Sequence, residues 1–214
     1  MRREQREQQE QLMPERYEQG EQPAGRYEPD DLKEAVRVLQ EGGVVLYPTD
    51  TVWGLGCDAT NAEAVARIFR IKQRADAKAM LCLLDTPGKL QGYVEEVPDM
   101  AWELIDLSTK PLTIIYPHAR NLAKNLMAED GSVGIRITKE TFSKALCERL
   151  HKPVVSTSAN LSGEPTPRNF SQIVEDVKQQ ADYIVRYRRN DLAEPAPSSI
   201  IKLDKGNVIK VIRP

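Results

Sequence analysis

Three short segments concentrate the polar and charged groups that could bind an anion and take part in catalysis. They are YPTDTVWGLG (47–56), KQR (72–74) and STSANLSGEPTP (156–167). In the second segment two cations flank one residue and can reach neighbouring oxygens of a polyphosphate, although such charges also suit the C-terminal end of a helix. In the third segment hydroxyl and amide groups are dense enough to surround an anion or a ribose.

Other common catalytic and cofactor motifs are missing from the sequence. It contains no GxxxxGK[ST] loop, no GxGxxG fingerprint, no HExxH and no CxxC. His118 and His151 lie beside polar or turn residues, so we expect them at the surface. The three cysteines, Cys57, Cys82 and Cys147, are far apart in apolar surroundings and are expected to be buried thiols. The chemistry must therefore come from hydroxyls, cations and backbone groups.

Length and composition suit one domain. The chain has 214 residues, a net charge of −2 and 40% hydrophobic residues. Its apolar runs are far shorter than the roughly 20 residues of a membrane-spanning helix, and MRREQREQQEQ at the start has no apolar core of a secretory signal. We expect a cytoplasmic protein without membrane association.

Helices and strands are expected to alternate after a polar N-terminal arm, residues 1–30, which is rich in Glu, Arg and Gln. Helical spacing predicts helices near 30–41, 61–74, 99–107, 139–150 and 172–178. Asp30 or Asp31 is the expected cap of the first helix and Asn61 that of the second. Short β-branched runs predict strands at 44–47, 79–84, 112–116, 133–137, 154–156, 183–185, 199–203 and 208–212. This order predicts an α/β (α+β) fold around one mixed, twisted sheet in residues 31–214, with ligands bound off the strand ends.

Five segments in a fixed order carry a family resemblance. YPTDTVWGLGCDATN, IKQR, GIR, STSANLSGEPTP and PSSIIKLD together resemble the YrdC-type threonylcarbamoyl-AMP synthase family over residues 32–213. The resemblance implies a YrdC-like fold with a large concave cavity. It also implies the conversion of L-threonine, bicarbonate and ATP into threonylcarbamoyl-adenylate and pyrophosphate, the first step toward N6-threonylcarbamoyladenosine in tRNA. Implied partners are the tRNA threonylcarbamoyl-transferase proteins that act downstream, and Mg²⁺ would enter on the ATP phosphates.

The resemblance also implies roles for particular residues. Lys72 and Arg74 would be the catalytic cations on the phosphates. The threonine site would comprise Thr49, Thr51, Arg136 and Ser199, and the nucleotide site Lys72, Arg74, Thr113, Ser158, Asn160, Thr166 and Arg213. No residue is expected to bind a metal directly.

The implied reaction does not need an enzymatic nucleophile. The carbamate formed on threonine attacks the α-phosphorus, so the protein has only to position the substrates and neutralise charge. This chemistry is compatible with the absence of a histidine base in the motifs. It leads us to expect that Lys72, Arg74, Ser158 and Asn160 meet at one cavity.

The chain departs from the family pattern at several positions. Ala75 and Ala79 stand where relatives carry proline, Thr109-Lys110-Pro111-Leu112-Thr113 replaces a PGPxT segment, and Ile137-Thr138 follows the arginine of GIR. These changes lie on the nucleotide side of the implied site. The KxR pair itself is kept, which favours an enzyme.

Alternatives stay open. One is a non-catalytic RNA- or ribosome-binding relative that could contact tRNA or double-stranded RNA, for which a net charge of +1 over residues 31–214 is weak support. Another is a carbamoyl-transfer relative such as the domain of hydrogenase maturation, disfavoured because zinc-finger cysteines are missing. The arm is either a solvated tail or a segment that packs on a neighbouring subunit, so an oligomer is possible.

Overall fold

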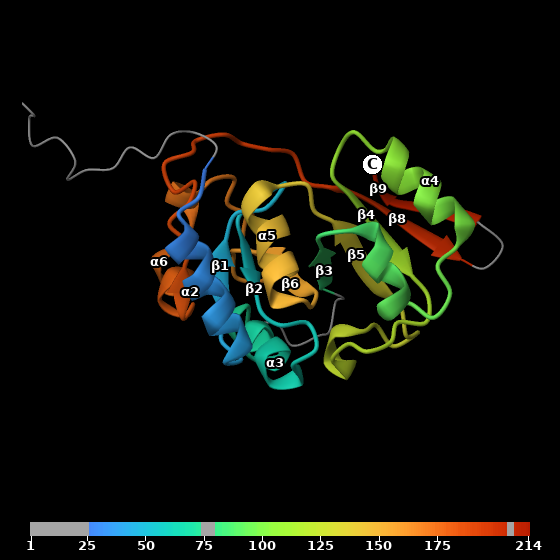
Figure 1. The fold of residues 1–214 in the computed structure, drawn as a ribbon. Helices are drawn as coiled ribbons and strands as arrows, with labels where there is room; N and C mark the ends of the chain where they lie inside the picture. Colours follow the sequence, from blue (N-terminus) through green and yellow to red (C-terminus); the bar gives the residue numbers. More distant parts are fainter. Residues whose placement is uncertain (1–25, 74–79, 205–207) are drawn as a thin grey trace, which may run out of the picture.

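The structure is a computed structural model that describes residues 26–73, 80–204 and 208–214. Its described strands form one sheet in the order β7-β1-β2-β6-β3-β5-β4-β8-β9 (Figure 1). They are β1 (Val45–Tyr47), β2 (Gly54–Gly56), β3 (Leu81–Leu84), β4 (Leu112–Tyr116), β5 (Val133–Ile137), β6 (Val154–Ser158), β7 (Tyr183–Ile184), β8 (Ser199–Asp204) and β9 (Val208–Arg213). The pairs β1–β7, β3–β5 and β4–β8 are parallel and the other pairs antiparallel, so the predicted mixed sheet is confirmed.

Helices pack beside this sheet. They are α2 (Pro29–Gln40), α3 (Ala62–Ile71), α4 (Asp99–Leu107), α5 (Thr141–Leu150) and α6 (Glu175–Gln179), with short 3-10 helices η1 (Pro87–Gly92), η2 (Lys124–Leu126) and η3 (Phe170–Gln172). Figure 1 shows α2, α3 and α6 gathered beside β1 and β2, and α4 near the other end of the sheet. No helix in the described ranges is long and apolar enough to cross a membrane.

The start of α3 follows its sequence signal and the start of α2 does not. Asn61 caps α3, accepting hydrogen bonds from the backbone N–H groups of the second and third helical residues at 3.0 and 3.1 Å. The expected cap of α2 at Asp30 or Asp31 is wrong, because Pro29 occupies the first helical position, where its fixed φ suits the helix. Asp31 is instead fully buried and accepts the hydroxyl of Tyr183 at 2.7 Å.

One strand near the site escapes the sequence analysis. β2 is a Gly-Leu-Gly segment that pairs antiparallel with both β1 and β6. A Cβ on Gly56 would lie 2.5 Å from the ring of Tyr47 and 2.7 Å from the carbonyl oxygen of Val155. Glycine is therefore required here by close packing, although glycines in a sequence more often indicate a loop.

Most other expectations hold. The helix at 99–107 and the strands at 112–116 and 133–137 have the predicted bounds, while the helix expected at 172–178 is divided between η3 and α6. All three cysteines are buried, and both histidines are exposed. Arg74, Ala75, Ala79 and the first 25 residues lie outside the described residues.

Candidate functional site

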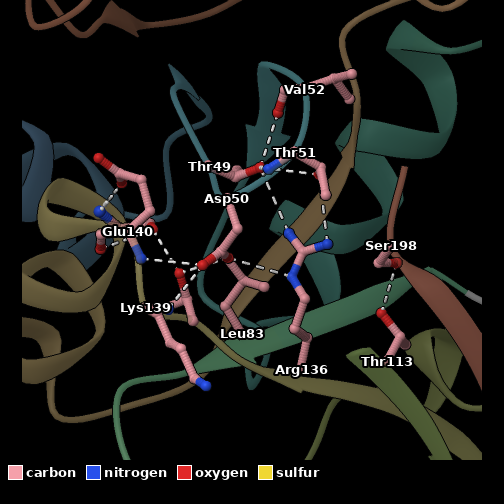
Figure 2. A network of polar contacts seen from close by, with 12 residues as sticks. Thr49, Asp50, Thr51, Val52, Leu83, Thr113, Arg136, Lys139, Glu140 and Ser198 are labelled. Carbon is pink, nitrogen blue, oxygen red and sulfur yellow. Dashed lines mark hydrogen bonds and ion pairs between the residues drawn. The ribbon is translucent and has the colours of Figure 1, made fainter. Parts of the chain in front are cut away.

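A buried arginine forms the centre of the site. Arg136 on β5 is 3% exposed, and its two terminal guanidinium nitrogens lie 3.4 Å from the hydroxyls of Thr49 and Thr51 (Figure 2). Those hydroxyls lie 3.2 Å apart in the loop between β1 and β2. Three of the residues expected at the threonine end therefore meet, although 85 positions separate Thr51 from Arg136.

The Arg136 guanidinium has weaker partners than a buried cation usually has. Burial lowers its pKa, while the nearby carboxylate of Asp50 acts in the opposite direction. Asp50 Oδ2 lies 3.4 Å from Nε, but Nε makes no hydrogen bond among the described residues. Because the threonine contacts are also long, an incoming carboxylate can replace them at small cost.

Asp50 itself is held firmly at the start of α5. Its Oδ1 accepts the backbone N–H groups of Lys139 at 2.7 Å and Glu140 at 2.9 Å. Its Oδ2 accepts the hydroxyl of Thr138 at 2.7 Å. The sequence analysis did not single out Asp50, since an acidic residue between two threonines has no distinctive spacing.

A second group of hydroxyls lies beside Arg136. Thr113 on β4 is opposite Arg136 in the antiparallel ladder, and its hydroxyl lies 3.0 Å from that of Ser198. Arg213 on β9 donates to the carbonyl oxygen of Ser198 at 2.8 Å and to its hydroxyl at 3.2 Å. Thr113 and Arg213 are thus joined through Ser198, which the sequence analysis did not name.

The expected residue Ser199 lies one position further along. It is half-buried in β8, opposite Leu112 of β4. Successive side chains of a strand point to opposite faces, and it is Ser198 that contacts Thr113. A sequence run of two serines cannot distinguish these positions, because the register of β8 decides which hydroxyl faces the site.

Two of the residues expected at the nucleotide end, Ser158 and Asn160, lie around Lys72. This lysine lies just after α3, is 4% exposed and donates to the main-chain oxygens of Ser158 at 2.6 Å and Asn160 at 2.7 Å. The Ser158 hydroxyl donates to Asn160 Oδ1 at 2.5 Å. Lys72, Ser158 and Asn160 therefore form one cluster, while Arg74, expected with them at one cavity, lies outside the described residues. Thr166 lies in an exposed part of the loop that follows β6.

β2 connects the two clusters. Gly54 pairs with Ser158 on β6, and a Cβ added at Gly54 would lie 3.3 Å from the Ser156 hydroxyl and 3.6 Å from a methyl group of Thr49. The loop around Asn160 and the threonines that contact Arg136 thus lie on either side of β2 at Gly54, where the strand carries no side chain.

The segment between β7 and β8 lies across the threonine end. Arg188, in the left-handed region with a φ of 64°, donates to the carbonyl oxygen of Thr49 at 3.3 Å and pairs with Asp191 at 2.8 Å. A recess of about 10 Å³ is lined there by Thr49, Thr51, Trp53 and residues of this segment. No sequence signal distinguished Arg188 from the neighbouring Arg186 and Arg189.

The donors of the site do not form a cage for a metal ion. Within the described ranges there is no group of three or more His, Cys, Asp or Glu side chains that could hold one. Asp50, the carboxylate closest to Arg136 in the network, already accepts three hydrogen bonds. The hydroxyls, amides and cations of the site suit an anion that brings a bound metal ion with it. They suit a bare divalent cation less well.

The Sua5/YciO/YrdC family model, described as "Telomere recombination", matches residues 37–214, and the chain belongs to this family. The family predicted from the sequence motifs is therefore confirmed.

Three relatives illustrate the likeness. The chain is 36% identical to the threonylcarbamoyl-AMP synthase of Pseudoalteromonas translucida over 154 residues, which cover 71% of this chain and 82% of the relative. It is similar to P. abyssi Sua5 complexed with L-threonine (26% identity, TM-score 0.76, covering 86% of this chain and 54% of that one). It is also similar to E. coli YciO, with 26% identity and a TM-score of 0.75. The match covers 87% of this chain and 91% of that one. The chain spans just over half the length of P. abyssi Sua5.

Proposed function

We propose that this protein is a threonylcarbamoyl-AMP synthase, which makes threonylcarbamoyl-AMP and pyrophosphate from L-threonine, bicarbonate and ATP. The observation that carries the proposal is the placement of buried Arg136 against the Thr49 and Thr51 hydroxyls. The relative from P. translucida bears the name of this activity, and the P. abyssi protein binds L-threonine. Both support the proposal.

At the threonine end, Arg136 takes the substrate carboxylate. A planar guanidinium can bind both oxygens of a carboxylate. The guanidinium of Arg136 is buried, so water competes little for its hydrogen bonds. Thr49 and Thr51 then pair with the substrate hydroxyl instead of with Arg136. Arg188 lies over the Thr49 carbonyl and closes this end against solvent.

At the nucleotide end, the loop after β6 carries the contacts. Ser158 and Asn160 present hydroxyl and amide groups, while Thr113 on β4 and Arg213 on β9 are proposed to complete the site from strands further along the sheet. Lys72 and Arg74 are the proposed phosphate ligands, and Arg74 lies outside the described residues. The ammonium group of Lys72 also donates to main-chain oxygens of Ser158 and Asn160, so it supports this loop.

The protein promotes the proposed reaction by positioning the substrates. The amine of threonine takes up CO₂ and loses a proton to form a carbamate, and a carbamate oxygen forms a bond to the α-phosphorus of ATP. The bond from this phosphorus to the bridging oxygen breaks, and pyrophosphate leaves with its electron pair. Preorganised donors reduce the cost of the developing charge. Mg²⁺ held by phosphate oxygens would neutralise part of the charge of the triphosphate.

The product is an activated intermediate, so a tRNA threonylcarbamoyl-transferase must consume it. We place the enzyme in the cytoplasm, where tRNA is modified. The N-terminal arm remains a candidate for contact with a second subunit.

A non-catalytic RNA-binding protein is the second candidate. A groove of about 1110 Å³ along α2 and β7 is lined by five cations, namely Lys33, Arg37, Arg149, Arg186 and Arg189. Acidic neighbours weaken this basic face, since Arg37 pairs with Glu34 at 2.6 Å and Arg186 lies 3.7 Å from Asp31. RNA binding without activity, weakening steeply with salt, would favour this candidate.

The test of the proposed activity is pyrophosphate release from ATP with threonine or bicarbonate omitted in turn. Release should require both. Arg136→Met should abolish it, whereas Arg149→Met, which removes an exposed arginine of α5, should leave it unchanged. Release without threonine, or full activity of Arg136→Met, would contradict the proposal.

A further inference from the structure

Asp50 joins the loop between β1 and β2 to the start of α5 and to Arg136. Three short hydrogen bonds reach its carboxylate, from the Thr138 hydroxyl and the backbone of Lys139 and Glu140 (Figure 2). An ionised carboxylate offers about four acceptor positions. Three are thus occupied from the α5 side, and Oδ2 also lies 3.4 Å from Arg136 Nε.

This arrangement divides the guanidinium of Arg136 into two edges. The Nε edge lies toward Asp50, and the two terminal nitrogens lie toward Thr49 and Thr51. Because the guanidinium is planar, fixing the Nε edge also fixes where the other two nitrogens point. The carboxylate is rigid, since its own partners are backbone amides and a buried hydroxyl.

We propose that Asp50 is a positioning residue of the threonine site, which holds the Arg136 guanidinium with its terminal nitrogens aimed at the substrate carboxylate. The inference rests on the proposed function for the identity of the substrate. Asp50 does not touch the substrate, because its oxygens are engaged by α5 and Arg136. Its negative charge also partly compensates the buried cation, for which Asp50 is the acidic contact drawn in Figure 2.

Asp50→Asn tests the charge and keeps the shape. The amide oxygen can still accept hydrogen bonds from the backbone N–H groups of Lys139 and Glu140, so the N-terminal end of α5 keeps these contacts. The amide nitrogen then faces Arg136 Nε, and two donors oppose each other where a carboxylate stood. We expect the KM for threonine to rise about tenfold or more, with the KM for ATP changed less than about threefold.

Thr138→Val is the matched control. It removes one hydrogen bond to the same carboxylate but leaves the charge facing Arg136. If Asp50 only anchored α5, both variants would affect the KM for threonine and the midpoint of thermal unfolding alike. We expect Thr138→Val to keep the KM for threonine within about threefold of wild type. Equal effects of the two variants on this KM would overturn the proposal.

A double-mutant cycle asks whether Asp50 acts through Arg136. In an Arg136→Lys background the fork is already lost, so Asp50→Asn should change the KM for threonine by less than about twofold. A tenfold effect that persists in this background would overturn the proposal. If Asp50→Asn does not fold, the single variant Arg136→Lys tests the proposal. An unchanged KM for threonine in this variant would mean that the orientation of the guanidinium does not affect threonine binding, and it would overturn the proposal. Failure of the proposed function is separate, because wild-type protein would then show no threonine-dependent turnover.

Discussion

The ammonium group of Lys72 lies 2.6 Å from the main-chain oxygen of Ser158 and so joins the end of α3 to the end of β6. A second main-chain oxygen, that of Asn160, lies 2.7 Å from the same nitrogen. Cations that bind carbonyl oxygens in a buried position hold a loop in one conformation. The nucleotide end of the site therefore depends on Lys72 through the loop that it supports.

Lys72→Met should lower both stability and activity. Two partly buried carbonyl oxygens lose a charged donor, which costs about 2 to 3 kcal/mol of the free energy of unfolding. The KM for ATP should rise more than that for threonine. The matched control is Arg70→Met, which removes an exposed cation from the last turn of α3. Equal unfolding midpoints for the two variants would show that the Lys72 contacts are not stabilising.

Arg74→Ala should lower kcat/KM by about a hundredfold or more, since one preorganised charge donor at a phosphate contributes roughly 3 to 4 kcal/mol. Arg74→Lys should restore little, because a point charge replaces a fork. Steady-state kinetics with varied ATP measure both. This prediction rests on the sequence motif alone, and activity within about threefold of wild type would refute it.

Threonine should be preferred to serine by about ten- to a hundredfold, because the two differ by one methyl contact. The margin over valine should be larger. Valine cannot replace the hydrogen bond that the threonine hydroxyl is proposed to make with the buried hydroxyls of Thr49 and Thr51. Pyrophosphate release with each amino acid at saturating ATP and bicarbonate measures the preference. Equal rates with all three would exclude these hydroxyls as the threonine pocket.

The Glu140 carboxyl should make stability depend on pH. Burial raises its pKa above the usual range, even though it accepts the backbone N–H of Ser143. A group with a raised folded-state pKa favours folding below its unfolded pKa of about 4.3 and loses that contribution as the pH rises. Glu140→Gln should therefore raise the unfolding midpoint at pH 7, and the gain should vanish near pH 4.

The control for that prediction is Glu148→Gln, an exposed position on the same helix. It should change the unfolding midpoint little at either pH. A lower midpoint for Glu140→Gln at pH 7 would mean that the ionised carboxylate, with Arg188 3.9 Å away, stabilises the fold after all.

Helices and strands that local sequence determines could be predicted, whereas those that depend on tertiary packing could not. α4 and β4 have their expected bounds because apolar periodicity specifies both. β2 was missed because packing against Tyr47 and Val155 selects its glycines.

The same distinction applies to the site. The family resemblance and the chemistry that it implies indicated that Lys72 and Ser158 belong together, and they do. The choice of Ser198 over Ser199 depends on strand register, and the contact of Asp50 with Arg136 depends on a loop and a strand 86 positions apart in the sequence. Neither relationship leaves a local pattern in the sequence.

The most direct test follows the carbon of bicarbonate. The purified protein is incubated with ATP, L-threonine and ¹³C-bicarbonate, and the nucleotide products are identified by mass spectrometry, with Arg136→Met as the inactive control. The proposed reaction predicts threonylcarbamoyl-AMP that carries the ¹³C label, formed in step with pyrophosphate and absent with the variant. ATP turnover without a labelled threonine adduct, or an unlabelled product, would contradict it.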